Sequence, residues 1–329
     1  MSVSKNEAAR IAYRAFMEKQ YFSPEEQELR IRQASDPEYW RKLNPQLSVG
    51  DFSSEDIEAE PFSEQRTAAM LAKLKKEGYF SSQIPLIKKE LCDKMLQGVE
   101  NLRKAGWHEV WSFVYDEFWA VLRTPSLLKL LPQTLGEGYK AMPHAVVHYV
   151  HPETGAGWSP HVDFSSRDDR FTVWMPISEA TIDNGCMYAI AQNRVSPELL
   201  QKWINMEDLS HREIKVLLQA SRALPIEAGG VLAWESKVIH WGTMSSANVQ
   251  PRVSLSVVYL RENITPHPDE IPLLLPEARP TYAQKMLTVA KAIGYYKAHV
   301  LALHKYIEMA TKIETMYRSQ AEEEAGIKK

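Results

Sequence analysis

Two histidines and one aspartate in this chain have the residue types and the spacing of metal ligands. His161 and Asp163 stand two positions apart, and His240 follows much later in the sequence. Positions i and i+2 of an extended strand point to the same face, so the first two side chains can reach one ion. Two imidazoles and one carboxylate form the facial set that holds non-haem Fe(II) and leaves positions open for other ligands. The set therefore predicts an iron site that supports oxygen chemistry.

The same residues also have ordinary interpretations. A lone His-x-Asp triplet is a weak signal, because His161 could be a solvated turn histidine and Asp163 a helix cap. The metal interpretation gains weight from the polar residues that follow later in the chain, in an order that suits a single site.

An arginine on a predicted strand is the first of these. The strict alternation of residues 252–257 predicts a half-buried strand that carries Arg252, Ser254 and Ser256 on one face. A guanidinium group binds two carboxylate oxygens at once, and a neighbouring hydroxyl adds a donor. Arg252 and Ser254 therefore predict a binding site for a carboxylate.

Strands and turns are predicted around the ligands. Residues 144–150 form a candidate strand, and the turn-rich stretch 153–160 leads from it to His161. Residues 229–234 begin with two glycines and continue as an apolar run, which predicts another strand shortly before His240. Each ligand is thus expected at or near the end of a strand.

These motifs together resemble the Fe(II)/2-oxoglutarate dioxygenases and, within them, the phytanoyl-CoA dioxygenase-like family. The resemblance covers about residues 70–262. Besides the residues above, it rests on segments 74–80, 127–131 with Leu135-Gly136, 171–177, Asp183-Asn184-Gly185-Cys186-Met187 and His240-Trp241-Gly242. It implies an α+β protein with a mainly β core, a double-stranded β-helix (jelly roll, cupin-like) flanked by N-terminal helices and a long C-terminal helix.

The resemblance also implies roles for individual residues. His161, Asp163 and His240 match the iron ligands. Arg252 matches the anchor for the far carboxylate of the cosubstrate 2-oxoglutarate, with Ser254 as a helper, and Trp174 falls where the family places an aromatic residue against that cosubstrate.

The implied reaction consumes O2 and 2-oxoglutarate, releases succinate and CO2, and oxidises a carbon of a small-molecule substrate. Related halogenases have a small residue in place of the carboxylate ligand. Because Asp163 is present, the resemblance implies hydroxylation, desaturation or cyclisation. A role in secondary metabolism is expected.

Two arginines are candidates for the substrate. Where the family has a Pro-Gly-Ser-His box, this chain has Ala191-Gln192-Asn193-Arg194, so Arg194 is expected near the mouth of the site. Arg170 ends a charge run, 167–170, that directly follows the metal pair. A run of this kind is usually a solvated loop, but Arg170 could also meet a substrate carboxylate.

Aromatic residues suggest the rest of a substrate pocket. His148 and Trp241 are candidates. His148 belongs to a loose series with His144 and His151 that is better explained as strand histidines than as a second metal site, because no acidic or thiol partner lies at ligand spacing. The other aromatic candidates are Trp158, Trp174, Tyr188 and Trp234.

Three parts of the chain follow from these patterns. Residues 1–60 are expected to form a helical N-terminal extension, with helices at 8–19 and after Ser23-Pro24. Residues 61–270 should form the double-stranded β-helix domain, with a helical insertion at 196–223 of the kind that often covers an active site.

Residues 276–329 are expected to form a C-terminal helical tail. Its apolar residues fall at alternating three- and four-residue steps, a heptad seam made of Met286, Val289, Ile293, Tyr296, Val300, Leu303, Ile307 and Ala310. Such a seam either docks on the rest of the chain or forms a homodimer contact.

Composition limits the partners. The 329 residues are 44% hydrophobic and 25% charged, enough for one sizeable core, and the net charge of -3 argues against nucleic acid or anionic lipid as a partner. The sequence has no long apolar run or signal-peptide core, so no membrane contact and a cytoplasmic location are expected. Cys92 and Cys186 are not expected to form a disulfide.

Two other functions stay open at this stage. One is a catalytically silent jelly roll that acts as an interaction protein, and the other is a cupin-type metalloenzyme that does not use 2-oxoglutarate. The intact ligand set opposes the first, and Arg252 with Ser254 opposes the second, because a dicarboxylate cosubstrate needs that cation.

Overall fold

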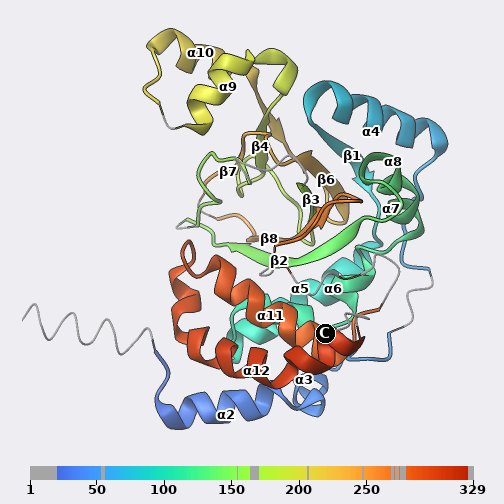
Figure 1. Ribbon diagram of the computed structural model, residues 1–329, viewed down its shortest axis with the longest axis vertical. Coiled ribbons are helices and arrows are strands. Elements are labelled where there is room, and N and C mark those ends of the chain that lie inside the picture. The colour runs from blue at the N-terminus through green and yellow to red at the C-terminus, as the bar shows by residue number, and fades with distance from the viewer. Residues whose placement is uncertain are drawn as a thin grey trace, which may run out of the picture.

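The computed structural model describes residues 21–52, 56–153, 155–163, 170–205, 207–246, 248–267, 270, 274 and 279–324. The predicted helix at 8–19 and most of the charge run 167–170 lie outside these ranges. Within them the chain is an α+β protein with antiparallel sheets, as expected (Figure 1).

The larger sheet has five antiparallel strands in the order β1-β6-β3-β8-β2. Their bounds are Tyr79–Pro85 for β1, Gly230–Glu235 for β6, Arg170–Pro176 for β3, Arg252–Leu260 for β8 and Lys140–Val150 for β2. The strands predicted at 144–150, 229–234 and 252–257 are all present. β2 begins four positions before its predicted start, since 140 precedes 144 by four.

β8 is buried on both faces, so the prediction of a half-buried strand is wrong. Val253, Leu255 and Val257 face the main core, while Arg252 and Ser256 face a cavity on the other side of the sheet. Every residue of β8 is buried. The alternation of polar and apolar residues therefore marks an enclosed site, and not a face in contact with bulk solvent.

A smaller sheet lies against the cavity side and has the order β5-β4-β7. β5 spans Ser221–Leu224, β4 spans Met187–Ile190 and β7 spans His240–Gly242. Side chains of both sheets meet in one buried cluster that includes Tyr79, Trp174, Met187, Ala189, Leu232 and Trp234.

The predicted insertion at 196–223 is helical but consists of two helices, α9 (Pro197–Ile204) and α10 (His211–Ala220), and its last residues belong to β5. Ser196 caps the N-terminus of α9 and Ser210 caps that of α10, so each helix has its own start signal. The described residues of both helices pack around Leu199 and Leu217 and do not line the cavity.

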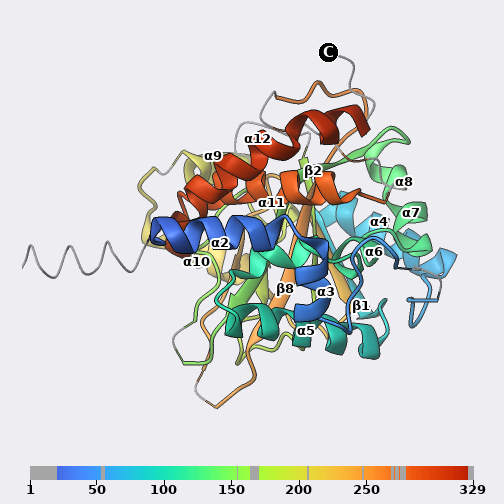
Figure 2. The ribbon, with the colours of Figure 1, turned by 90° about the horizontal axis from the view of Figure 1, so that it is seen from below.

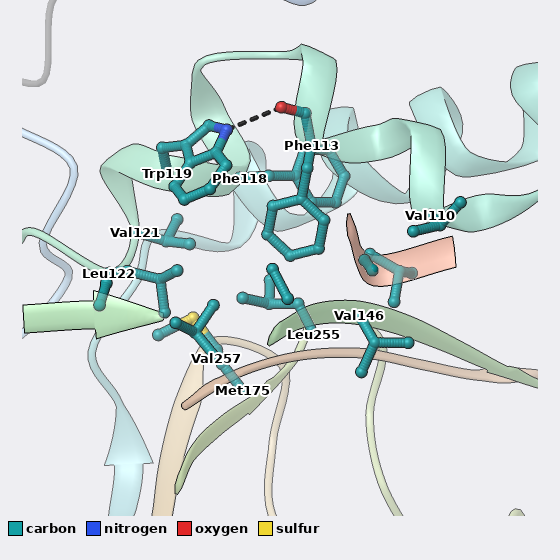
Figure 3. Packing of buried hydrophobic residues seen from close by; sticks show 14 of the residues in the cluster. Val110, Phe113, Phe118, Trp119, Val121, Leu122, Val146, Met175, Leu255 and Val257 are labelled. Carbon is teal, nitrogen blue, oxygen red and sulfur yellow. Dashed lines mark hydrogen bonds between the residues drawn. The ribbon is translucent and has the colours of Figure 1, made fainter. Parts of the chain in front are cut away.

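Helices cover the other face of the larger sheet. They are α5 (Lys89–Lys104), the 3-10 helix η1 (Glu109–Val114), α6 (Glu117–Ala120), α7 (Pro125–Leu130) and α8 (Pro132–Leu135), while α4 (Glu64–Glu77) lies beside β1. Figure 3 shows Phe113, Phe118 and Trp119 from this layer packed over Leu255 and Val257 of β8. The indole of Trp119 donates to the carbonyl of Phe113 at 2.7 Å, which removes the cost of burying its N–H group.

Two N-terminal helices complete this side, α2 (Pro24–Ala34) and α3 (Pro37–Leu43). The helix predicted after Ser23-Pro24 is confirmed: the Ser23 hydroxyl accepts from the backbone N–H of Glu26 at 3.2 Å. In α3, Trp40 is fully buried and packs against Trp107 and Trp111.

The sequence predicted one long C-terminal helix, and this prediction is wrong: the tail consists of several helices. α11 (Tyr282–Tyr296) ends at a turn, the 3-10 helix η4 (Leu301–Tyr306) follows, and α12 (Ile307–Glu324) returns along α11 (Figure 2). The apolar spacing continues across the break because both helices bury side chains in the same core.

Six of the eight seam residues are buried within the chain: Met286, Val289, Ile293, Tyr296, Leu303 and Ala310. This is the internal packing that the first of the two alternatives expects. A dimer contact would have to use other surfaces of these helices.

Two further expectations concern cysteines and membranes. Cys92 and Cys186 are both buried and form no disulfide, as expected. None of the helices in the described ranges combines the length and the apolar character needed to cross a bilayer.

Candidate metal centre

The two histidines of the predicted ligand set lie directly opposite each other. The segment around His161 runs antiparallel to β7, and the backbones of His161 and His240 exchange hydrogen bonds of 3.1 and 3.0 Å. The imidazole centroids are 4.4 Å apart. Asp163 Oδ1 lies 3.5 Å from His161 Nε2 and 3.4 Å from His240 Nε2. Residues far apart in sequence therefore present three donor atoms to one point.

Backbone carbonyls set the protonation of both histidines. His161 Nδ1 lies 2.7 Å from the carbonyl oxygen of Ser159, and His240 Nδ1 lies 2.9 Å from that of Val238. A carbonyl can only accept, so each Nδ1 carries the proton. Each Nε2 is then the atom that points toward Asp163 and the one through which the imidazole can bind a metal ion.

The carboxylate is oriented in the same way. Thr172 Oγ1 donates to Asp163 Oδ2 at 2.6 Å, and Trp234 Nε1 donates to it at 2.8 Å, which leaves Oδ1 for the histidines. Burial by itself raises the pKa of Asp163, but His240, His161 and Thr172 together lower that pKa well below its ordinary value. Asp163 is therefore ionised at neutral pH.

Two glycines allow the close approach of the strands. A Cβ atom on Gly157 would lie 2.3 Å from the Cα of Gly242, and one on Gly242 would lie 2.8 Å from the Cα of Gly157. Only residues without side chains fit at this crossing. Gly157 donates to the carbonyl of Thr243 at 3.0 Å, so the contact also fixes the register that brings His161 opposite His240.

The donor set fits a divalent transition-metal ion. With metal–ligand bonds of about 2.1 Å, neighbouring ligand atoms at right angles stand about 3 Å apart. The two His–Asp separations of 3.4 and 3.5 Å are close to this value, and all three ligand atoms lie within 4.8 Å of one another. In the ranges that the structure describes, this is the one group of three histidine, cysteine or acidic residues close enough to share an ion.

The metal centre opens into a cavity of about 1020 Å³ that also contains Arg252. This arginine is 2% exposed, and its Nε and Nη1 atoms donate to Gly185 O at 3.1 Å and Ser254 Oγ at 2.7 Å. Burial lowers the pKa of Arg252 to about 10, so the group stays charged at neutral pH. Among the described residues no acidic side chain pairs with it.

Trp174 stands beside this cation. The guanidinium carbon of Arg252 lies 5.6 Å from the centroid of the Trp174 ring. The Trp174 Nε1 atom is buried and has no hydrogen-bond partner within the described part of the chain. An unpaired buried cation next to an unpaired buried donor is costly in an empty cavity and favours an anionic ligand with several oxygens.

Ser254 has a different place from the predicted one. It is fully buried and does not line the cavity; its hydroxyl instead accepts from Arg252 and holds the guanidinium in place. His148 does line the cavity, and burial followed by the charge of Arg252 lowers its pKa to about 3, so its imidazole is neutral.

Three predicted substrate residues lie elsewhere. Arg170 is buried in an ion pair with Glu270. Arg194 ends the 3-10 helix η2 (Gln192–Arg194) on the exposed surface. Trp241 follows His240 on β7, so it faces away from the ion and stacks on Tyr188 at 5.4 Å. These three side chains do not line the cavity.

Several residues that line the cavity could not be assigned to it from the sequence around them. Trp158 was expected in the pocket and does line it, whereas Thr172 and the tail residues Tyr295, Tyr296 and His299 were not assigned to it. Tyr296 belongs to the apolar seam, a pattern that indicates core packing. Only the packing of α11 against β2, the edge strand of the larger sheet, shows that the tail reaches the cavity.

The sequence model of the phytanoyl-CoA dioxygenase (PhyH) family matches residues 85–251, which is 167 of the 329 residues. No curated protein sequence matches the chain. Among solved structures, the non-heme monooxygenase ThoJ is 14% identical with a TM-score of 0.50, and the alignment covers 74% of this chain and 99% of ThoJ. At that identity the likeness shows a shared fold.

Three further solved structures match with TM-scores below 0.5. The non-heme alpha ketoglutarate dependent carbocyclase SnoK is 16% identical over 64% of this chain and 87% of its own, with a TM-score of 0.45. The epimerase SnoN is 15% identical over 60% and 84%, with a TM-score of 0.46. The chain spans half the length of EvdMO1, to which it is 14% identical with a TM-score of 0.47 over 60% of its own residues.

Proposed function

The chain belongs to the phytanoyl-CoA dioxygenase family, and we propose that it is a non-haem Fe(II)/2-oxoglutarate-dependent oxygenase acting on a small molecule. The observation that carries this proposal is the pairing of two unsatisfied features in one cavity. Three ligand atoms converge without a fourth protein ligand among the described residues, and a buried arginine faces the same space without a counter-ion.

Each part of the site has a task in this proposal. His161, Asp163 and His240 hold Fe(II) through Nε2, Oδ1 and Nε2. Arg252 pairs with the far carboxylate of 2-oxoglutarate, and the Trp174 N–H group is a further donor within the same cavity. Bound iron supplies the activation of O2 that is coupled to decarboxylation of the cosubstrate.

The protein itself orients the metal ligands and encloses the substrate. Thr172 and Trp234 keep Asp163 turned toward the ion. The aromatic walls around Trp158 exclude water and hold a substrate carbon near the metal, which lowers the entropy cost of the reaction. Asp163 fills the position that a halogenase leaves free, which supports hydroxylation, desaturation or cyclisation with release of succinate and CO2.

The proposal includes the architecture. The two antiparallel sheets form a jelly roll over residues 61–270, with residues 1–60 and 276–329 as helical extensions. The arrangement of two sheets around a metal site supports this division. Because tail residues line the cavity, the catalytic unit includes the C-terminal extension.

Anaerobic spectroscopy tests the proposal directly. Under nitrogen, Fe(II) and 2-oxoglutarate together should produce a weak visible charge-transfer band, because both bind in one site. Arg252→Ala should weaken 2-oxoglutarate binding by about 100-fold, since it removes a charged group worth roughly 1.5–3 kcal/mol per hydrogen bond. Arg194→Ala is the matched control, because Arg194 is exposed and outside the cavity.

Two results would contradict the proposal. A wild-type protein that binds iron but gives no band would be a metalloenzyme that does not use 2-oxoglutarate. A protein that binds neither would be a silent jelly roll with an interaction role. An Arg252→Ala variant with the same band as the wild type would remove the arginine from cosubstrate binding.

A further inference from the structure

The C-terminal tail forms one wall of the cavity, although it lies outside the segment that matches the family. The tail residues that line it are Tyr295, Tyr296, His299, Val300, Leu301 and Leu303, with Ala302. Tyr295, His299 and Leu301 are exposed and stand at the mouth, while Tyr296 and Leu303 are buried deeper. The turn between α11 and η4 is therefore part of the site.

Tyr296 is the buried tyrosine of this wall and is linked to the metal centre through one aromatic neighbour. Its ring meets Trp158 edge to face at 5.6 Å, and Trp158 lies 5.5 Å from the ligand His161. Burial, then Tyr295 and Asp163, raise the pKa of Tyr296 well above its ordinary value, which agrees with a hydroxyl on the metal side of the helix.

Among the described residues the Tyr296 hydroxyl has no hydrogen-bond partner, and it is not one of the side-chain atoms that are fully enclosed without a partner, so it opens to the cavity that Tyr296 lines. Other buried tyrosines of the same layer are satisfied: Tyr306 donates to Gly106 O at 2.8 Å, and Tyr115 donates to Trp40 O at 3.1 Å. A phenol hydroxyl that faces a cavity without a protein partner is available to bond a ligand. The cavity is the space from which that ligand can come.

The wall around Tyr296 is aromatic and carries no unpaired charge among its described members. Arg103 forms an ion pair with Glu109 at the rim, and His148 is neutral. Trp158 and His299 present rings 5.6 Å apart at a tilt. Aromatic faces of this kind bind flat or ring-containing molecules well. A volume of about 1020 Å³ is slightly above the range of about 300–1,000 Å³ that is typical of small-molecule pockets.

We propose, on the basis of the proposed function, that Tyr296 donates a hydrogen bond to an oxygen atom of the organic substrate, which is an uncharged, ring-containing molecule held against Trp158. The tail thereby sets substrate specificity. Arg252 stays available for 2-oxoglutarate, because the substrate has no carboxylate to compete for it.

Binding of 2-naphthol to the full-length protein tests this inference. Titration under nitrogen, with and without Fe(II) and 2-oxoglutarate, is followed by quenching of tryptophan fluorescence. Tyr296→Phe keeps the ring and removes only the donor, so it should weaken 2-naphthol binding roughly three- to tenfold, the value of one neutral hydrogen bond. Tyr188→Phe is the matched control, because Tyr188 lies outside this cavity.

The titration has clear contrary outcomes. Equal affinity of the wild type and Tyr296→Phe would overturn the hydrogen bond, as would the absence of 2-naphthol binding to the wild type. Binding of 2-naphthoate as tight as that of 2-naphthol would overturn the uncharged class. Weaker 2-oxoglutarate binding in Tyr296→Phe would assign the hydroxyl to the cosubstrate instead. Because the probe is measured without turnover, failure of the iron chemistry alone would leave these affinities intact.

Discussion

At the scale of single residues, the neighbours of each ligand decide its chemical state. The carbonyls of Ser159 and Val238 place the protons of His161 and His240 on Nδ1, away from the ion. Asp163 keeps its negative charge in a buried position because histidines and hydrogen-bond donors surround it. The site is thus prepared for a cation before any cation binds, which reduces the cost of ordering ligands on binding.

Loss of the carboxylate should abolish turnover without unfolding the protein. We expect Asp163→Ala to form no succinate above the iron-free background and to lose bound iron, measured by product assay and metal analysis. The unfolding free energy should fall by only about 1–3 kcal/mol, because Thr172 and Trp234 lose an acceptor. Asp93→Ala on the exposed face of α5 is the control. Unchanged activity in Asp163→Ala would remove the carboxylate from the mechanism.

A buried histidine should make stability depend on pH. Burial lowers the pKa of His144 from 6.5 to about 4, so the unfolded chain binds a proton more readily than the folded chain between these values. The free energy of unfolding is therefore highest, as far as His144 is concerned, above pH 6.5, and it decreases as the pH falls toward 4. This pKa shift corresponds to a loss of roughly 3 kcal/mol in the free energy of unfolding.

Urea unfolding at several pH values measures this effect. His144→Leu should reduce the loss of stability between pH 6.5 and 4, whereas His211→Leu, on the exposed surface of α10, should not change it. The same slope in His144→Leu and the wild type would show that other groups cause the acid sensitivity.

At the scale of elements, the site depends on the pairing of two short segments. Residues 155–163 lie along β7, and backbone hydrogen bonds at His161–His240 and Gly157–Thr243 set the register. A slip of one residue would turn one imidazole away from the other. The glycine crossing is therefore as important for metal binding as the ligands.

Gly157→Ala should weaken metal binding with little effect elsewhere. The new Cβ would lie 2.3 Å from the Cα of Gly242, so the two segments must separate. We expect at least about a tenfold loss of Fe(II) affinity, as for changes in groups that orient ligands, measured by anaerobic competition with a chelator. Gly294→Ala in α11 is the control, because no atom lies within 4 Å of its added Cβ. Wild-type affinity in Gly157→Ala would contradict the role of the crossing.

At the scale of the whole molecule, the helical layer ties the two ends of the chain to the sheet. Lys285 of α11 is 1% exposed and pairs with Asp116, whose other oxygen accepts backbone N–H groups of Gly50 and Asp51 at 2.6 and 3.1 Å. One carboxylate thus joins the C-terminal tail to the loop after α3. This joint holds α11 where Tyr296 can reach the cavity.

Removal of the lysine should loosen the tail. Lys285→Met leaves the partly buried Asp116 without its cation. Breaking a fully buried pair costs about 3–5 kcal/mol, so a loss up to the lower end of this range is expected. We expect this loss in urea unfolding, with faster amide exchange in α11 and α12. Lys297→Met changes an exposed lysine in the following turn and should be nearly neutral. Equal stability of Lys285→Met and the wild type would show that the pair does not hold the tail.

Much of the core and of the site could be predicted from the sequence because local periodicity reports which residues share a face. The alternation in 252–257 identified a strand and grouped Arg252 with Ser254, and the His-x-Asp spacing grouped two ligands. Helix caps such as Ser23 marked where a helix begins. The α+β class and the family followed from the same local motifs.

The tertiary structure decided what lies opposite each of these faces. Spacing does not reveal that β8 is enclosed on both sides, that Trp241 faces away from the cavity, or that Arg170 is occupied by Glu270. Nor does a heptad pattern show that the tail breaks after Tyr296 and places that residue beside Trp158. A sequence pattern encodes the face that a residue shares with its near neighbours, whereas the partner on that face depends on contacts between distant segments that only the packed chain brings together.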